Sequence, residues 1–87
     1  MGQAEAALNA IRSSSAYNSA YDEAVNSVLK LIAGYETEDY ASIRAMADAL
    51  EELNADLFGK PQNGERKSAV QYLREAANAL ESYEAYK

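Results

Sequence analysis

Two groups of side chains have types and spacing that could support chemistry. The first is Ser27 with Lys30, which matches the S-x-x-K pattern of serine acyl-transfer enzymes. In those enzymes the lysine activates a serine one helical turn away. The chain lacks their companion motifs, and 87 residues are far too few for their fold. We therefore interpret this match as a coincidence of helical spacing.

The second group is a row of carboxylates. Asp48, Glu52 and Asp56 are spaced four residues apart, with Glu51 alongside, so they share one side of a helix. Carboxylate oxygens suit hard cations such as Ca²⁺. A straight helix, however, supplies no loop to wrap an ion, and like charges on an exposed helical face are normally solvated. We expect no metal to bind there.

The residue types that the sequence lacks narrow the chemistry further. There is no cysteine, which excludes disulfides and thiolate metal sites, and no histidine, the commonest general base and transition-metal ligand. A carboxylate-bridged di-metal site in a helical bundle needs a Glu-x-x-His motif from two helices. The sequence also offers no combination of nucleophile, base and electrophile. It therefore predicts a protein that is not an enzyme and that needs no cofactor.

Charge and hydropathy limit the partners. A net charge of −6, with eight basic residues scattered along the chain, disfavours nucleic acid and anionic membrane surfaces. No apolar run is long enough to span a membrane, and the residues after Met1 lack the basic and apolar regions of a signal peptide. We expect a monomer that requires no partner and that stays in the cytosol when expressed as given.

The carboxylate row lies on the segment with the most consistent helical signals, residues 38–58. Its large apolar residues recur at steps of three and four: Tyr40, Ile43, Met46, Leu50, Leu53 and Leu57. Thr37 is a suitable N-cap, and Glu38 and Asp39 complement the helix dipole. Gly59 is a typical residue after a helix end. Because an amphipathic helix of this length is not stable alone in water, the flanking segments must pack against it.

Three further segments have amphipathic helical patterns, at residues 3–12, 16–33 and 65–86. The serines Ser13–Ser15 favour a turn between the first two, with Ser15 and Ser19 as candidate caps for the next helix. The alternative is one continuous helix over 3–33, because the apolar phase runs through without a slip. That helix would be about 45 Å long and would overhang the rest of the molecule. We therefore predict the break.

These segments predict an all-α fold in one domain, residues 1–87. The short connection 34–37 requires neighbouring antiparallel helices, so the expected architecture is an up-down helical bundle with three main antiparallel helices and a shorter N-terminal one, four in all. Eighteen alanines against eight leucines predict flat helix faces and close helix approach, with the seven tyrosines supplying bulk.

Such a bundle gathers aromatic and acidic residues at one of its ends. The end of the second helix, the start of the third and the end of the fourth meet there, and together they carry Tyr35, Tyr40, Tyr83, Tyr86, Glu36, Glu38 and Asp39. Tyrosines beside carboxylates suit a basic protein partner. The alternative is that the rings only close the end of an alanine-rich core. Three or more exposed rings on one face would favour the partner-binding patch.

Residues 35–43, Tyr-Glu-Thr-Glu-Asp-Tyr-Ala-Ser-Ile, precede an alanine-rich helix and the spacing Val70, Leu73, Ala77, Leu80. This half of the chain resembles the second half of FIVAR modules, small three-helix domains of bacterial surface proteins. The connection over 54–69 is longer here than in that family. The resemblance implies a non-catalytic spacer or protein-interaction module on an exported protein.

The composition favours a designed or synthetic origin. His, Cys and Trp are all absent, and each helix has its stop or turn signal where a designer would place it. The surface fits a design less well, since Glu and Lys pairs four residues apart are nearly absent. We therefore expect first a non-catalytic soluble helical bundle, a scaffold with no evolved activity. The second expectation is a natural interaction or spacer module.

Overall fold

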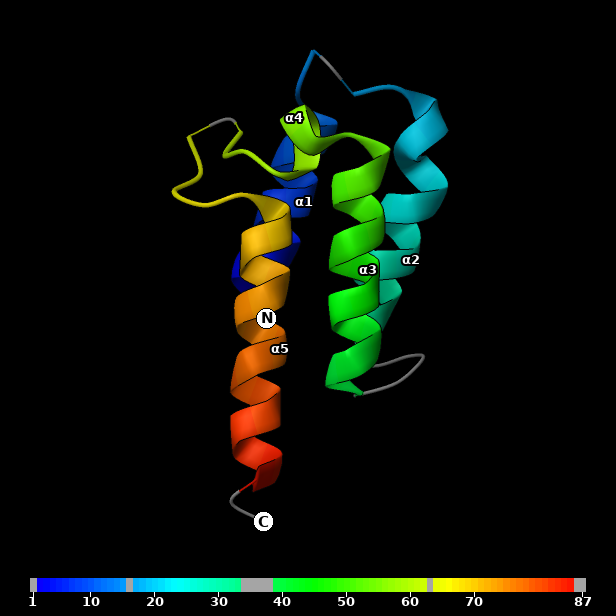
Figure 1. Cartoon of the computed structure of the whole chain (residues 1–87). Helices are drawn as coiled ribbons and strands as arrows, with labels where there is room; N and C mark the ends of the chain where they lie inside the picture. Colours follow the sequence, from blue (N-terminus) through cyan, green and yellow to red (C-terminus); the bar gives the residue numbers. More distant parts are fainter. Residues whose placement is uncertain (1, 16, 34–38, 63, 86–87) are drawn as a thin grey trace.

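Helices dominate the residues that the structure describes, 2–15, 17–33, 39–62 and 64–85, and no strand occurs among them. In these ranges the computed structural model has α1 (Gly2–Arg12), a 3₁₀ turn η1 (Ser19–Tyr21), α2 (Asp22–Ile32), α3 (Tyr40–Leu53), α4 (Ala55–Phe58) and α5 (Ala69–Ala85) (Figure 1). The all-α prediction is confirmed. The predicted number of four helices is wrong, because the segment 38–58 contains two helices, α3 and α4, rather than one.

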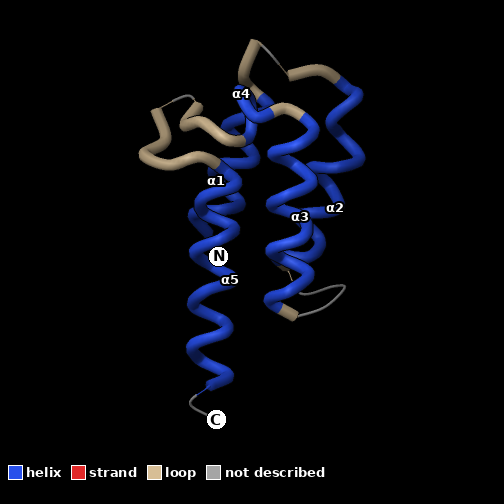
Figure 2. Tube along the Cα trace, viewed as in Figure 1, coloured by secondary structure: helices blue, strands red, loops and turns tan. Residues whose placement is uncertain are grey.

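The four longer helices surround a common apolar core. α3 lies along α5, α1 contacts both α5 and α2, and α2 contacts α3. Successive long helices run in opposite directions, with α1 and α3 directed towards the α4 end and α2 and α5 away from it (Figure 1). Most of the described loops gather at that same end (Figure 2). The radius of gyration, 12.4 Å, is close to the ~12 Å expected for a compact chain of this length.

The break between α1 and α2 confirms the predicted turn at Ser13–Ser15. Both predicted caps for the next element are wrong, however. Neither Ser15 nor Ser19 caps it; instead Asn18 Oδ1 accepts a hydrogen bond from Ala20 N at 2.8 Å and caps η1. The regular helix α2 therefore starts later than the predicted residue 16, because a 3₁₀ turn precedes it.

Asn54 both ends α3 and begins α4. Its N–H bonds to the carbonyl of Leu50 at 3.1 Å, and its backbone is extended, with φ −163° and ψ 95°. Its side chain accepts a hydrogen bond from Leu57 N at 3.1 Å and donates one to the hydroxyl of Tyr21 at 3.1 Å. The asparagine side chain competes with the backbone for the hydrogen bonds of a helix and favours cap positions. This explains why the helix is interrupted at Asn54. The resulting turn places Leu57 and Phe58 in the core.

Two other helix starts are set by side-chain caps. The predicted cap Thr37 lies outside the described residues, and the N-cap of α3 is Asp39, whose Oδ1 accepts a hydrogen bond from Ala41 N at 3.1 Å. Ser68 Oγ accepts one from Gln71 N at 3.0 Å, so α5 begins after Ser68 rather than at residue 65. Each oxygen satisfies an N–H that has no partner within its helix.

The core combines large side chains with buried alanines, as the alanine-rich composition predicts. The largest fully buried side chains are Phe58, Leu8, Ile11, Ile43, Leu50, Leu57, Leu73, Val25, Val28 and Val70. Alanines fill the narrower positions between the helices, at Ala4, Ala7, Ala47, Ala69 and Ala77. Ser68 is the only buried polar residue among those described, and its hydroxyl is the α5 cap.

Aromatic rings close the core at the α4 end. The rings of Tyr21 and Phe58 pack edge to face, with centroids 5.6 Å apart and planes at 80°, and the Tyr17 ring centroid lies 5.8 Å from that of Tyr21. Edge-to-face contacts of this kind are favourable. Desolvation, followed by the hydrogen bond to Asp22, raises the pKa of the Tyr17 phenol above its ordinary value. Tyr17 therefore remains a neutral donor at pH 7.

Leu8→Ala tests how firmly α1 belongs to the core. Leu8 is completely buried, so its truncation leaves a cavity and should lower the free energy of unfolding by about 2 to 4 kcal/mol. The matched control is Leu53→Ala, because Leu53 is 48% exposed; we expect a loss of about 1 kcal/mol or less. Urea unfolding followed by circular dichroism measures both. Equal losses for the two variants would contradict the packing of α1.

Asn54→Ala tests the turn between α3 and α4. The variant loses the α4 cap and the donor to the Tyr21 hydroxyl, so unfolding should become easier by about 1 to 2 kcal/mol. Tyr21→Phe removes only the second interaction and should have the smaller effect. Asn9→Ala, at an exposed position of α1, is the control that should not destabilise. An Asn54→Ala protein as stable as the parent would show that the cap is dispensable.

Candidate functional site

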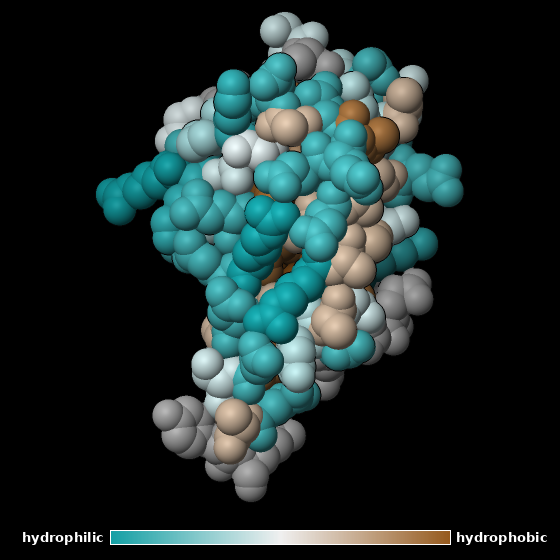
Figure 3. Space-filling view, viewed as in Figure 1, coloured by the Kyte–Doolittle hydropathy of each residue, from teal (hydrophilic) through white to brown (hydrophobic). Residues whose placement is uncertain are grey.

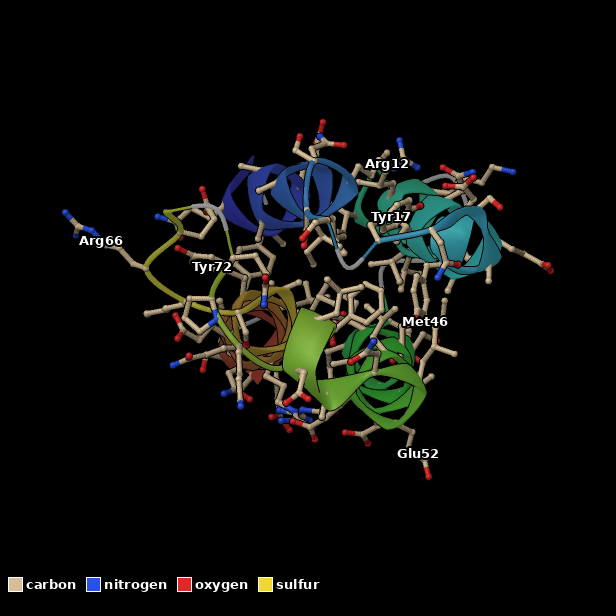
Figure 4. All side chains as sticks on the ribbon, turned by 90° about the horizontal axis from the view of Figure 1, so that it is seen from above. Arg12, Tyr17, Met46, Glu52, Arg66 and Tyr72 are labelled. Atoms are coloured by element: carbon tan, nitrogen blue, oxygen red, sulfur yellow. The ribbon has the colours of Figure 1, made fainter. Side chains whose placement is uncertain are left out.

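The structure separates the predicted carboxylate row. Arg74 of α5 donates hydrogen bonds to Asp48 at 2.7 Å and to Glu51 at 3.1 Å. Glu52 points into solvent from the outer side of α3 (Figure 4), and Asp56 lies on α4. Among the described residues, no group of three or more potential metal ligands converges. In this geometry the row contributes to the contact between α3 and α5.

A second arginine bridges the same two helices. Arg44 of α3 donates to Glu81 at 2.6 Å and to Asn78 at 2.7 Å, and its guanidinium lies 5.1 Å from the centre of the Tyr40 ring. The hydrogen bond to Glu81 raises the pKa of Arg44, and the hydrogen bonds to two carboxylates raise the pKa of Arg74. Both pKa values are shifted away from neutral pH, so the two arginines stay positively charged.

Ser27 and Lys30 do not form a catalytic pair in this structure. Both lie on α2, where Ser27 is half-buried and Lys30 is exposed, and no hydrogen bond joins the two side chains. A nucleophile and its base must lie within hydrogen-bonding reach of each other. The observed geometry therefore does not activate Ser27.

The predicted tyrosine patch lies only partly within the described residues. Four of its members fall outside them: Tyr35, Glu36, Glu38 and Tyr86. Of the others, Tyr40 is half-buried and packs against the core, whereas Tyr83 is 63% exposed. The carboxylate of Asp39 caps α3. Because only two of the four rings are described, the partner-binding patch stays a prediction.

An apolar groove lies between α2 and α3, on a face that the sequence analysis does not single out. Its volume is about 240 Å³, and it is lined by Ala24, Val28, Met46, Ala49, Leu50 and Leu53. Val28 and Leu50 form a buried floor, whereas Ala49 and Leu53 are exposed. Figure 3 shows a band of apolar residues along α3 on the side towards α2, and Figure 4 places Met46 between the two helices.

The sequence does contain a signal for this groove. Met46 and Leu53 belong to the predicted apolar stripe of residues 38–58, but Leu53 is half-exposed rather than part of the core. Ala45 and Ala49 lie beside them and are also exposed. An apolar stripe that continues past the buried positions into exposed alanines indicates a surface that the described part of the chain does not cover.

A second hollow is more polar. It has a volume of about 400 Å³, lies between α1 and the loop before α5, and is lined by Gln3, Ala6, Gly64, Glu65, Arg66 and Tyr72. Arg66 extends away from the helices into solvent (Figure 4). The Arg66 guanidinium is therefore not directed into the hollow. The residues that line the hollow include no nucleophile paired with a base.

Within the described parts of the chain, none of the helices has the length and apolar character needed to cross a membrane. Comparison with protein families, with curated proteins and with solved structures finds no match for this chain. Its function must be argued from the geometry above.

Arg74→Ala tests the bridge between α3 and α5. The Arg74 side chain is 42% exposed, so solvent screens the interaction, and we expect a loss of only about 0.5 to 1 kcal/mol in the free energy of unfolding. The loss should shrink in high salt. Arg66→Ala is the matched control, since Arg66 is exposed and forms no ion pair with a described residue. A salt-independent loss would mean that packing of the arginine stem, not its charge, matters.

Proposed function

We propose that this chain is a non-catalytic helical scaffold, an up-down bundle of designed origin with no evolved biochemical activity. It folds as one domain and as a monomer, with no cofactor or partner required. The observation that carries this proposal is the organisation of the interior. Side chains from all five described α-helices meet in one apolar core, and the only buried polar side chain among the described residues caps a helix.

The placement of charge also supports a scaffold. The described ion pairs lie at the surface, where their exposed side chains add little stability. The pKa values of Tyr17, Arg44 and Arg74 are all shifted upwards, away from neutral pH. A general acid or base needs a shift in the opposite sense for such groups. The absence of His, Cys and Trp from the sequence supports the designed origin.

A natural protein-interaction or spacer module is the second candidate function. Two surface features favour it: Tyr83 is 63% exposed, and Leu53 stands at the edge of an apolar groove. In this alternative, the tyrosine-rich end of the molecule binds a basic protein partner. Diverse natural relatives of the chain would support this alternative and contradict a designed origin.

Circular dichroism tests the scaffold proposal directly. Far-UV spectra and thermal unfolding, recorded with EDTA and then with added divalent metal, should be the same, with one cooperative transition in each condition. The reason is that the core consists of apolar side chains, which do not ligate a metal ion. Helicity that falls with the chelator, or rises with the metal, would contradict the proposal. Sedimentation equilibrium in the same buffers should give the mass of one chain.

A further inference from the structure

We propose that the loop before α5 carries a modification site, the peptide bond between Arg66 and Lys67, which a trypsin-like protease hydrolyses while the chain stays folded. Water is the co-reactant: its hydroxyl goes to the carbonyl carbon of Arg66 and its proton to the nitrogen of Lys67. The cut converts the chain into a complex of residues 1–66 and 67–87. This inference goes beyond the scaffold function and does not depend on a designed origin.

The Arg66 side chain is presented as such a protease requires. It is exposed, extends away from the helices into solvent (Figure 4) and forms no ion pair with a described residue. A trypsin-like protease holds the basic side chain before the cut bond with an aspartate in its S1 pocket. Arg66 can enter this pocket without giving up an ion pair to the described part of its own chain.

The backbone around this bond is also accessible. Arg66 and Lys67 lie in the loop between α4 and α5, and their backbone groups form no hydrogen bond with another described residue. A protease binds its substrate as an extended strand through main-chain hydrogen bonds, so such a segment is ready for binding. Beyond the bond, only the ion pair of Lys67 with Glu75 must be released, and both of these side chains are at least 40% exposed.

Three of the other basic residues are protected by helices. Lys30, Arg44 and Arg74 lie within α2, α3 and α5. A protease reaches a bond inside a helix only when that helix opens, so cleavage there depends on the small fraction of open molecules. The internal residues outside the described ranges, 16, 34–38 and 63, include neither Lys nor Arg.

The bonds after Arg12, Lys60 and Lys67 are protected in other ways. Arg12 bonds to Asn26, and the two N–H groups that follow it bond back to carbonyls of α1. Lys60 precedes a proline, whose missing N–H and fixed φ make the bond a poor substrate. The residues 68–70 after Lys67 are buried, so a cut there requires the start of α5 to open. Lys87, the last residue of the sequence, lies outside the described residues.

The packing of α5 holds the two pieces together after the cut. Val70, Leu73 and Ala77 are buried in the core, and the bridges of Arg44 and Arg74 between α3 and α5 do not involve the loop. The fragment 67–87 therefore stays bound through the same contacts. Because the two pieces are then separate molecules, the stability of the complex depends on its concentration.

Limited proteolysis of the full chain with trypsin tests the site, with mass spectrometry to identify the first fragments. We expect 1–66 and 67–87 to appear first. Arg66→Gln should slow the first cut at least roughly tenfold, because the remaining bonds need a helix or a turn to open. The matched control is Lys30→Gln, which removes the same charge at an exposed position within α2 and should leave the rate unchanged.

Ile43→Ala shows whether the folded or the unfolded chain is cut. Ile43 is buried near the start of α3, at the end of the molecule opposite the loop (Figure 1). The variant should raise the unfolded fraction roughly 30-fold or more without changing the loop. Cleavage of the folded chain should keep its rate within roughly twofold, whereas cleavage through global unfolding would accelerate with the unfolded fraction.

The cut protein itself provides the last readout. Both fragments should elute together in size-exclusion chromatography with the helicity of the parent, and the melting temperature should fall on dilution. Fragments that separate would overturn the two-chain complex. A first cut at another basic residue, an unchanged rate for Arg66→Gln, or acceleration by Ile43→Ala in proportion to the unfolded fraction would overturn the site.

Discussion

If α3 continued as a straight helix through Asn54, Phe58 would lie about 6 Å beyond Asn54 along the helix axis. Leu57 and Phe58 would then leave the core, whose end they now cover. The hydrogen bonds of Asn54 prevent this, because its side chain satisfies Leu57 N and the Tyr21 hydroxyl at once. Phe58 then meets Tyr21 edge-on, and the core is sealed at the end where the loops gather. The closure therefore depends on one polar side chain rather than on a longer apolar stripe.

The two seams of α3 are held together by different interactions. Towards α5, the arginines Arg44 and Arg74 bridge to carboxylates and an amide, so polar groups fasten the edge of the contact. Towards α2, no ion pair between described residues joins the helices, and the groove between them is lined by apolar side chains. The second seam lacks long charged side chains that would fold across its edge and cover it. This difference explains why the open groove lies there.

The all-α class could be predicted because it depends on apolar periodicity. The break at Ser13–Ser15 could be predicted because three successive serines favour a turn over a helix interior. The starts at Asn18, Asn54 and Ser68 could not, because each competed with several nearby polar residues of similar capping strength. Ser68-Ala-Val-Gln71 has the spacing of a capping box and was a usable signal. The ion pair of Arg74 with Asp48 spans 26 residues, so no local pattern reveals it. The groove could not be predicted, because apolar periodicity alone does not show whether another helix covers the apolar stripe.

Alanine-rich helices make such a groove a natural by-product of close packing. Small residues let two helices approach, but alanine at an outward position beside a longer residue leaves space above it. On α3 the exposed Ala49 stands between the longer Met46 and Leu53, and on α2 Ala24 lies one turn before Val28. The short side chains thus leave a hollow that the longer side chains border. The composition that tightens the core therefore also shapes this part of the surface.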